Sequence, residues 1–149
     1  MCINKGMAII TLFGIPILVI AVALFLLAIS IIDIKLKAVP KILTSAVILV
    51  LMIVNIPNIF FGLIATMFGF LLWELGEIGG IADIKAMTII GLMLSNVIQV
   101  FVFFIVVAVV GLLYKAFMKY VLKKKQEIAF IPVYFITFIL MNVIQFTFA

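Results

Sequence analysis

The chain has 149 residues, of which 70% are hydrophobic and 10% are charged, and its net charge of +5 is carried by ten lysines against five acidic residues. A soluble domain of this size could not bury so much apolar surface, so the composition predicts an integral membrane protein with one membrane-embedded domain over residues 1–149. One cysteine and no histidine exclude a disulfide framework, a cysteine- or histidine-ligated metal site, and a Ser-His or Cys-His nucleophile.

The predicted spans of the first half are separated by charges and helix breakers. Met7–Ile32 is uncharged and long enough to cross a membrane, with an expected kink at Pro16. Residues 42–73 carry no charge either. As one helix they would extend about 48 Å, well beyond a hydrocarbon core of roughly 30 Å. The turn signal at Asn55-Ile56-Pro57-Asn58 therefore predicts two short spans in place of one.

The second half predicts three further spans. One of them ends before Ser95. Asn96 and Gln99 have the spacing of a capping box, so the next helix is expected to begin there and to run to about Lys119. The last span is Ile128–Phe148. The sequence thus predicts an all-α, polytopic membrane protein with six transmembrane helices.

The placement of the lysines predicts which side faces the cytoplasm. With six spans, the connections after the first, third and fifth share one side of the membrane, and every lysine except Lys5 falls on that side. Basic residues are enriched in cytoplasmic loops, so this side is predicted to be cytoplasmic and both termini to lie outside the cell membrane.

Asp33 and Asp83 are the only aspartates, and both are expected near the cytoplasmic ends of helices one and four. Ionisable residues are costly in a membrane, so their default interpretation is functional. Two carboxyls that share a site of low dielectric do not both ionise readily, so one can hold a proton while the other activates water. The alternatives are a solvated interfacial carboxylate for Asp33 and a helix cap for Asp83.

Lys35 and Lys85 each follow an aspartate by two residues. Positions i and i+2 of a helix do not face each other, so both lysines are interpreted as extending toward lipid phosphates, without a catalytic role. The run Lys123-Lys124-Lys125 is interpreted as a signal for topology or anionic lipid, and no nucleic-acid partner is expected.

Three motifs resemble those of a known family. Asp33 is followed seven residues later by Pro40, Gly80-Ile81-Ala82-Asp83-Ile84-Lys85 has the pattern Gly-x-hydrophobic-Asp-x-Lys, and Ile131-Pro132-Val133-Tyr134-Phe135 opens the last helix. In these features the chain resembles the type IV prepilin peptidases and archaeal preflagellin peptidases, the Gly-x-Gly-Asp membrane aspartic proteases. It departs from them at Ala82, where the second glycine is usual, at Lys41, where asparagine is frequent, and in lacking the second proline of the last motif.

The resemblance implies an aspartic endopeptidase that removes a short basic leader from type IV pilin-like or archaellin-like precursors at the cytoplasmic face. Asp33 and Asp83 would be catalytic, with Gly79, Gly80, Pro40 and Lys85 as supporting motif residues and with no metal or organic cofactor. The precursors and membrane lipids would be its partners. The cysteine-rich cytoplasmic domain of bacterial members is absent, which is typical of an archaeal or a minimal bacterial form.

Glu74 and Glu77 precede the second aspartate motif and lie three residues apart. We hypothesise that they form a negative patch that orients the basic leader; the alternative is that they only offset nearby lysines or a helix dipole. Other function classes remain open. They are a small ion-coupled transporter with the aspartates as cation sites, a presenilin-like intramembrane protease, and a structural protein with interfacial aspartates.

Overall fold

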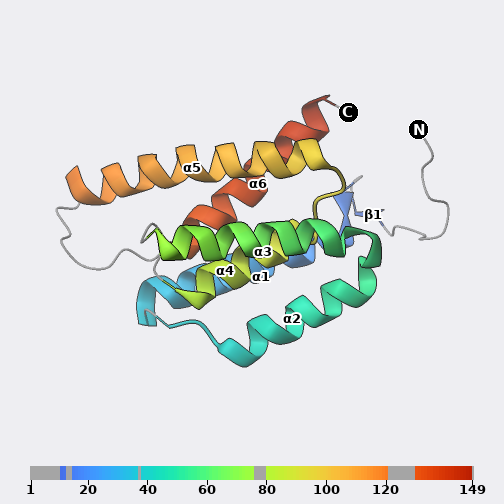
Figure 1. The fold of residues 1–149 in the computed structure, drawn as a ribbon, viewed down its shortest axis with the longest axis horizontal. Coiled ribbons are helices and arrows are strands. Elements are labelled where there is room, and N and C mark those ends of the chain that lie inside the picture. Colours follow the sequence, from blue (N-terminus) through green and yellow to red (C-terminus); the bar gives the residue numbers. More distant parts are fainter. Residues whose placement is uncertain (1–10, 13–14, 37, 76–79, 121–129, 149) are drawn as a thin grey trace.

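The computed structural model describes residues 11–12, 15–36, 38–75, 80–120 and 130–148 (Figure 1). These residues form six α-helices, one short 3-10 helix and one pair of two-residue antiparallel strands, so the predicted all-α class is confirmed for the described part of the chain. The elements are β1 (Thr11–Leu12), β2 (Ile15–Pro16), α1 (Ile17–Leu36), α2 (Lys41–Val54), η1 (Ile56–Asn58), α3 (Ile59–Glu74), α4 (Ile81–Gly91), α5 (Val97–Tyr120) and α6 (Ile131–Phe148).

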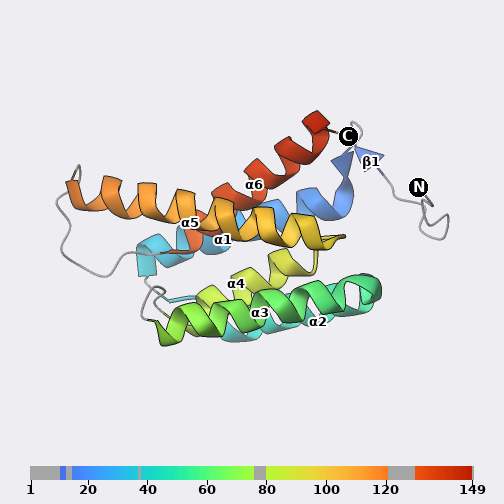
Figure 2. The ribbon, with the colours of Figure 1, turned by 45° about the horizontal axis from the view of Figure 1, so that its top comes forward.

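The helices form two groups of three, which Figure 2 shows one above the other. In the first group α4 packs against α2 and α3, and in the second α6 packs against α1 and α5. The groups meet where α4 contacts α6, with a smaller contact between α3 and α5. Successive helices run in opposite directions, so the ends of α1, α3 and α5 gather with the starts of α2, α4 and α6 at one end of the bundle (Figure 1).

Both predicted breaks between helices are present, because each has local turn chemistry. The turn at residues 55–58 separates α2 from α3. The side-chain amide of Asn58 donates to the backbone carbonyl of Leu92 at 3.4 Å. At the start of α5 the Asn96 carboxamide oxygen accepts the Gln99 N–H at 2.8 Å, as in a capping box. The Gln99 side chain returns to the N–H of Ser95 at 2.7 Å, one residue earlier than in the usual box.

The prediction of a kink at Pro16 is wrong. Pro16 is the last residue of β2, and α1 begins immediately after it at Ile17. Proline has no N–H to donate and a fixed φ, so it is well suited to precede a helix and here interrupts none. The helix also continues past the predicted end at Ile32, to Leu36. Residues 7–10 of the predicted span lie outside the described residues.

Helix length separates clear membrane spans from shorter elements. Among the described residues, three helical segments are long and apolar enough to cross a membrane: α1, the continuous segment Ile56–Glu74 and α5. The 14 residues of α2 and the 11 of α4 extend only about 21 and 16 Å, against a core of roughly 30 Å. The six-helix count is therefore confirmed within the described ranges, whereas six complete crossings stay a prediction.

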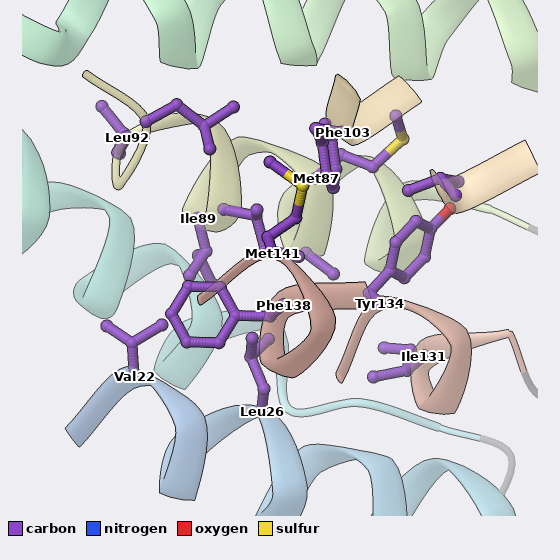
Figure 3. Packing of buried hydrophobic residues seen from close by; sticks show 14 of the residues in the cluster. Val22, Leu26, Met87, Ile89, Leu92, Phe103, Ile131, Tyr134, Phe138 and Met141 are labelled. Carbon is purple, nitrogen blue, oxygen red and sulfur yellow. The ribbon is translucent and has the colours of Figure 1, made fainter. Parts of the chain in front are cut away.

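The short helix α4 is enclosed by its neighbours. From Asp83 to Gly91 every residue except Lys85 is buried. Close approach to α3 is possible because α3 presents small residues, Gly62, Ala65 and Gly69, toward it. The core beside α4 is formed largely by side chains of α1, α4, α5 and α6. Figure 3 labels several of them, including Val22, Leu26, Met87, Ile89, Phe103, Tyr134, Phe138 and Met141.

Candidate active site

Asp33 lies in the last turn of α1, half-buried, against the start of α6. Its Oδ2 accepts the backbone N–H of Ile131, the first residue of α6, at 3.4 Å. First-turn N–H groups have no partner within their own helix, and Pro132 contributes no donor. The Asp33 carboxylate therefore accepts a hydrogen bond from one of these N–H groups and lies at the positive end of the α6 dipole.

Asp83 lies in the first turn of α4 and is only 6% exposed. Its own N–H donates to the Gly80 carbonyl at 3.0 Å, which closes the first turn of the helix. A buried carboxylate is costly, but a negative charge at a helix N-terminus is stabilised by about 0.3–1 kcal/mol, and by up to about 2 kcal/mol when partly buried. Each aspartate thus has a helix N-terminus that favours its ionised form.

Both aspartates interact with residues of the first turn of α6. Ile131, whose backbone N–H donates to Asp33, and Tyr134 lie three residues apart and so share one side of α6. Tyr134 interacts electrostatically with Asp83. Asp33 on α1 and Asp83 on α4 thus belong to different helix groups and lie at the same end of the bundle.

Pro40 and Gly80 occupy helix starts. Pro40 is the N-cap of α2, with φ −61°, and its carbonyl accepts both the N–H and the hydroxyl of Thr44 at 3.2 Å. Gly80 is the N-cap of α4, with extended backbone at φ 166° and ψ −172°, and a Cβ added there would have no neighbour within 4 Å. The backbone at Gly80 is therefore one that any residue can adopt, with room for a side chain. Gly79 lies outside the described residues.

The interpretation of Lys85 as a residue that extends to lipid is wrong. Its Nζ donates to the Ser45 hydroxyl at 2.7 Å and to the Lys41 carbonyl at 3.0 Å, both in the first turn of α2. The reason is the packing of α4 against α2, which places these acceptors within reach of the side chain. Lys85 thus links the helix that carries Asp83 to the helix that Pro40 begins.

Glu74 is the last residue of α3 and is exposed at the same end of the bundle. Glu77 lies outside the described residues, so the acidic patch stays a prediction, as does the role of Lys123–Lys125. Within the described ranges, no group of three or more His, Cys, Asp or Glu side chains is placed to hold a metal ion.

The sequence interpretation missed two tyrosines at this end of the bundle. Tyr114 on α5 interacts electrostatically with Asp33, as Tyr134 on α6 does with Asp83. The sequence indicates Tyr134 only as part of the last motif and gives no signal for Tyr114 at this site. The spacing of Tyr134 from Ile131 was visible in the sequence, but nothing there indicated that this side of α6 faces the aspartates.

Comparison of the chain with protein-family models, with curated proteins and with solved structures found no match. The family resemblance therefore stays a prediction from the motifs of the sequence.

Proposed function

We propose that this protein is a membrane aspartic endopeptidase that removes the short basic leader of type IV pilin-like or archaellin-like precursors at the cytoplasmic face of the cell membrane. The observation that supports this proposal best is the position of Asp33 and Asp83, which approach the same turn of α6 from different helix groups. An aspartic protease requires two carboxyls that act on one peptide bond, and the placement of both aspartates at one end of the bundle supports such a pairing.

In the proposed reaction the two carboxyls share one proton. The ionised carboxyl takes a proton from water, whose oxygen bonds to the scissile carbonyl carbon, while the protonated carboxyl donates to the carbonyl oxygen. The C–N bond then breaks as the departing nitrogen takes the proton from the protonated carboxyl. A hydroxyl of the diol gives its proton to the other carboxyl as the new carboxyl terminus forms, so the pair again holds one proton. Both carboxyls lie at helix N-termini, so this feature does not distinguish their roles. The roles of acid and base therefore belong to the pair as a unit.

The charges at this end of the bundle support a cytoplasmic site. All the described lysines lie near this end of the bundle, at the ends of α1 and α5 or near the starts of α2 and α4. They are Lys35, Lys41, Lys85, Lys115 and Lys119. Lysine-rich ends of membrane helices face the cytoplasm by the positive-inside rule. The apolar helix of a precursor would then lie in the membrane, with its basic leader on the cytoplasmic side of the aspartates.

The transporter alternative has less support. Transporters of broken-helix design bind their substrates and coupling ions near the middle of the membrane. Here Asp33 is in the last turn of α1 and Asp83 in the first turn of α4, so both lie at one end of the bundle.

The proposal is tested with purified protein in lipid vesicles and a precursor that has a lysine-containing leader and an apolar helix. Asp33→Asn and Asp83→Asn should each abolish cleavage, and the double variant should be no worse than either, since the pair acts as a unit. Glu74→Gln, a carboxyl-to-amide change at an exposed position of the same end, should retain most of the activity. Near-normal cleavage by either single aspartate variant, with folding verified by circular dichroism, would remove the proposed mechanism.

A further inference from the structure

We propose that Tyr134 is the positioning residue of Asp83, and that its buried hydroxyl donates a hydrogen bond to the Asp83 carboxylate when substrate is bound. The inference rests on the proposed function and extends it by a residue outside the aspartate motifs. In this role the phenol would fix the orientation of the Asp83 carboxyl toward the scissile peptide bond.

The first observation is the state of the Tyr134 hydroxyl. The residue is 0% exposed, and its hydroxyl has no hydrogen-bond partner among the described residues. Buried hydroxyls nearly always have a partner, because an unsatisfied one costs free energy. An unpaired buried hydroxyl beside a candidate active site therefore calls for a partner in another state of the protein.

The second observation is where the hydroxyl points. Figure 3 shows the ring of Tyr134 standing off α6 toward α4 and α5, with the oxygen at its far end. Asp83 is in the first turn of α4, which packs against α6, and it interacts electrostatically with Tyr134. The donor and the carboxylate thus belong to the contact that joins the two helix groups.

The third observation is that the ring is held firmly. Tyr134 belongs to the hydrophobic core, and Phe130 packs edge-on against it with ring centroids 5.7 Å apart. A donor that is fixed by packing before the reaction needs little reorganisation during it, which makes its hydrogen bond effective for catalysis.

The competing explanation is that the ring only fills the core. In that case the hydroxyl is dispensable, and Tyr134→Phe, which keeps the ring, would have no effect on cleavage. Thr137 offers a matched control. It is also fully buried on α6, and its hydroxyl also has no partner among the described residues. It lies about one turn further from the start of the helix than Tyr134 does. Thr137→Val removes this hydroxyl and keeps the shape.

The first measurement is cleavage kinetics in lipid vesicles. Tyr134→Phe should lower kcat about 10- to 100-fold, the range expected for one hydrogen bond to a charged group, with little change in KM. Its unfolding midpoint should be equal to or above that of the wild type, because the variant no longer buries an unpaired hydroxyl. Thr137→Val should keep the wild-type kcat.

The second measurement does not depend on cleavage. A hydrophobic carbodiimide reacts with protonated carboxyls in membranes, and mass spectrometry of Asp83 labelling against pH gives a midpoint. A hydrogen bond to the carboxylate favours the ionised form, so Tyr134→Phe should raise this midpoint by about one pH unit in the presence of an uncleavable precursor peptide. Thr137→Val should leave it unchanged.

The outcomes separate this inference from the proposed function. If the wild type cleaves, Asp83→Asn does not, and Tyr134→Phe matches the wild type in kcat or in labelling midpoint, the role of Tyr134 is overturned while the proposed function stands. An equal fall in kcat for Thr137→Val also overturns it. If the wild type cleaves no precursor, the proposed function fails, and the labelling midpoint alone decides whether Tyr134 acts on Asp83.

Discussion

Replacing Gly91 with alanine tests whether the position of α4, which carries Asp83, depends on close contact with α3. A Cβ at Gly91 would lie 2.5 Å from the Ala65 Cβ, 2.9 Å from the Phe61 carbonyl oxygen and 3.0 Å from the Gly62 Cα. These atoms belong to the α3 backbone or are attached directly to it, so no side-chain rotation can remove the clash. The two helices must move apart.

The expected cost follows from these contacts. Overpacking of a well-packed interior costs about 1–3 kcal/mol, whereas exchanging glycine for alanine in a helix returns at most about 1 kcal/mol. We therefore expect Gly91→Ala to lower the free energy of unfolding by about 1–2 kcal/mol. Gly80→Ala is the matched control on the same helix, because its added Cβ meets nothing within 4 Å. It should be neutral or stabilising by about 0.4–1 kcal/mol, through the unfolded state.

The measurement is denaturation in mixed micelles, followed by the fluorescence of Trp73, the only tryptophan, in the last turn of α3. Equal unfolding midpoints for Gly91→Ala and Gly80→Ala would refute the argument that backbone contact with α3 holds α4 in place. The cleavage activity of Gly80→Ala should be measured as well. A loss of activity with normal stability would indicate that the motif glycine makes room for the substrate.

Three further predictions concern the same end of the bundle. Lys85→Met should lower the free energy of unfolding by about 0.5–1.5 kcal/mol, since it loses two hydrogen bonds to α2, and an unchanged denaturation midpoint would contradict a stabilising link. Glu74→Gln/Glu77→Gln should slow cleavage of a basic leader modestly and only at low salt, because exposed ion pairs contribute about 0–1 kcal/mol; an equal loss on a neutral leader would leave these glutamates structural. With the native cysteine removed, a cysteine at Lys124 should label from the cytoplasm and one at Asn58 from outside, and the reverse pattern would invert the proposed orientation.

The helix breaks could be predicted from the sequence because their chemistry is local. The cap at residues 95–99 contains the side chain that forms it, and the turn at residues 55–58 is closed by a backbone bond from the Asn58 N–H to the Asn55 carbonyl, with Pro57 inside it. The start of α1 was not predicted correctly, because the local sequence there is compatible with two structures. Proline is compatible both with a kink inside a span and with the entry to a helix, and the apolar residues on either side of Pro16 do not distinguish the two.

The sequence indicates the two aspartates of the candidate site but not the residues around them. Asp33 and Asp83 stand out because they are the only aspartates of an apolar chain. The inner face of α6 does not stand out, because a helix that is apolar on all sides has no polar face to define its orientation. The partner of Lys85 was equally hidden, since one acceptor is the backbone carbonyl of Lys41, and a backbone group has no sequence signature.

The division of the bundle into two helix groups has a consequence for how the protein is made. Helices α2, α3 and α4 are consecutive and can pack as soon as they emerge from the ribosome, whereas α1 packs chiefly against α6, which is synthesised much later. A segment as short as α4, with two charged side chains near its start, is a poor substrate for independent insertion and depends on α2 and α3 to shield it. Asp33 then reaches the turn that it shares with Asp83 only once α6 is in the membrane. For the proposed protease, the order of translation would delay activity until the last described helix has been inserted.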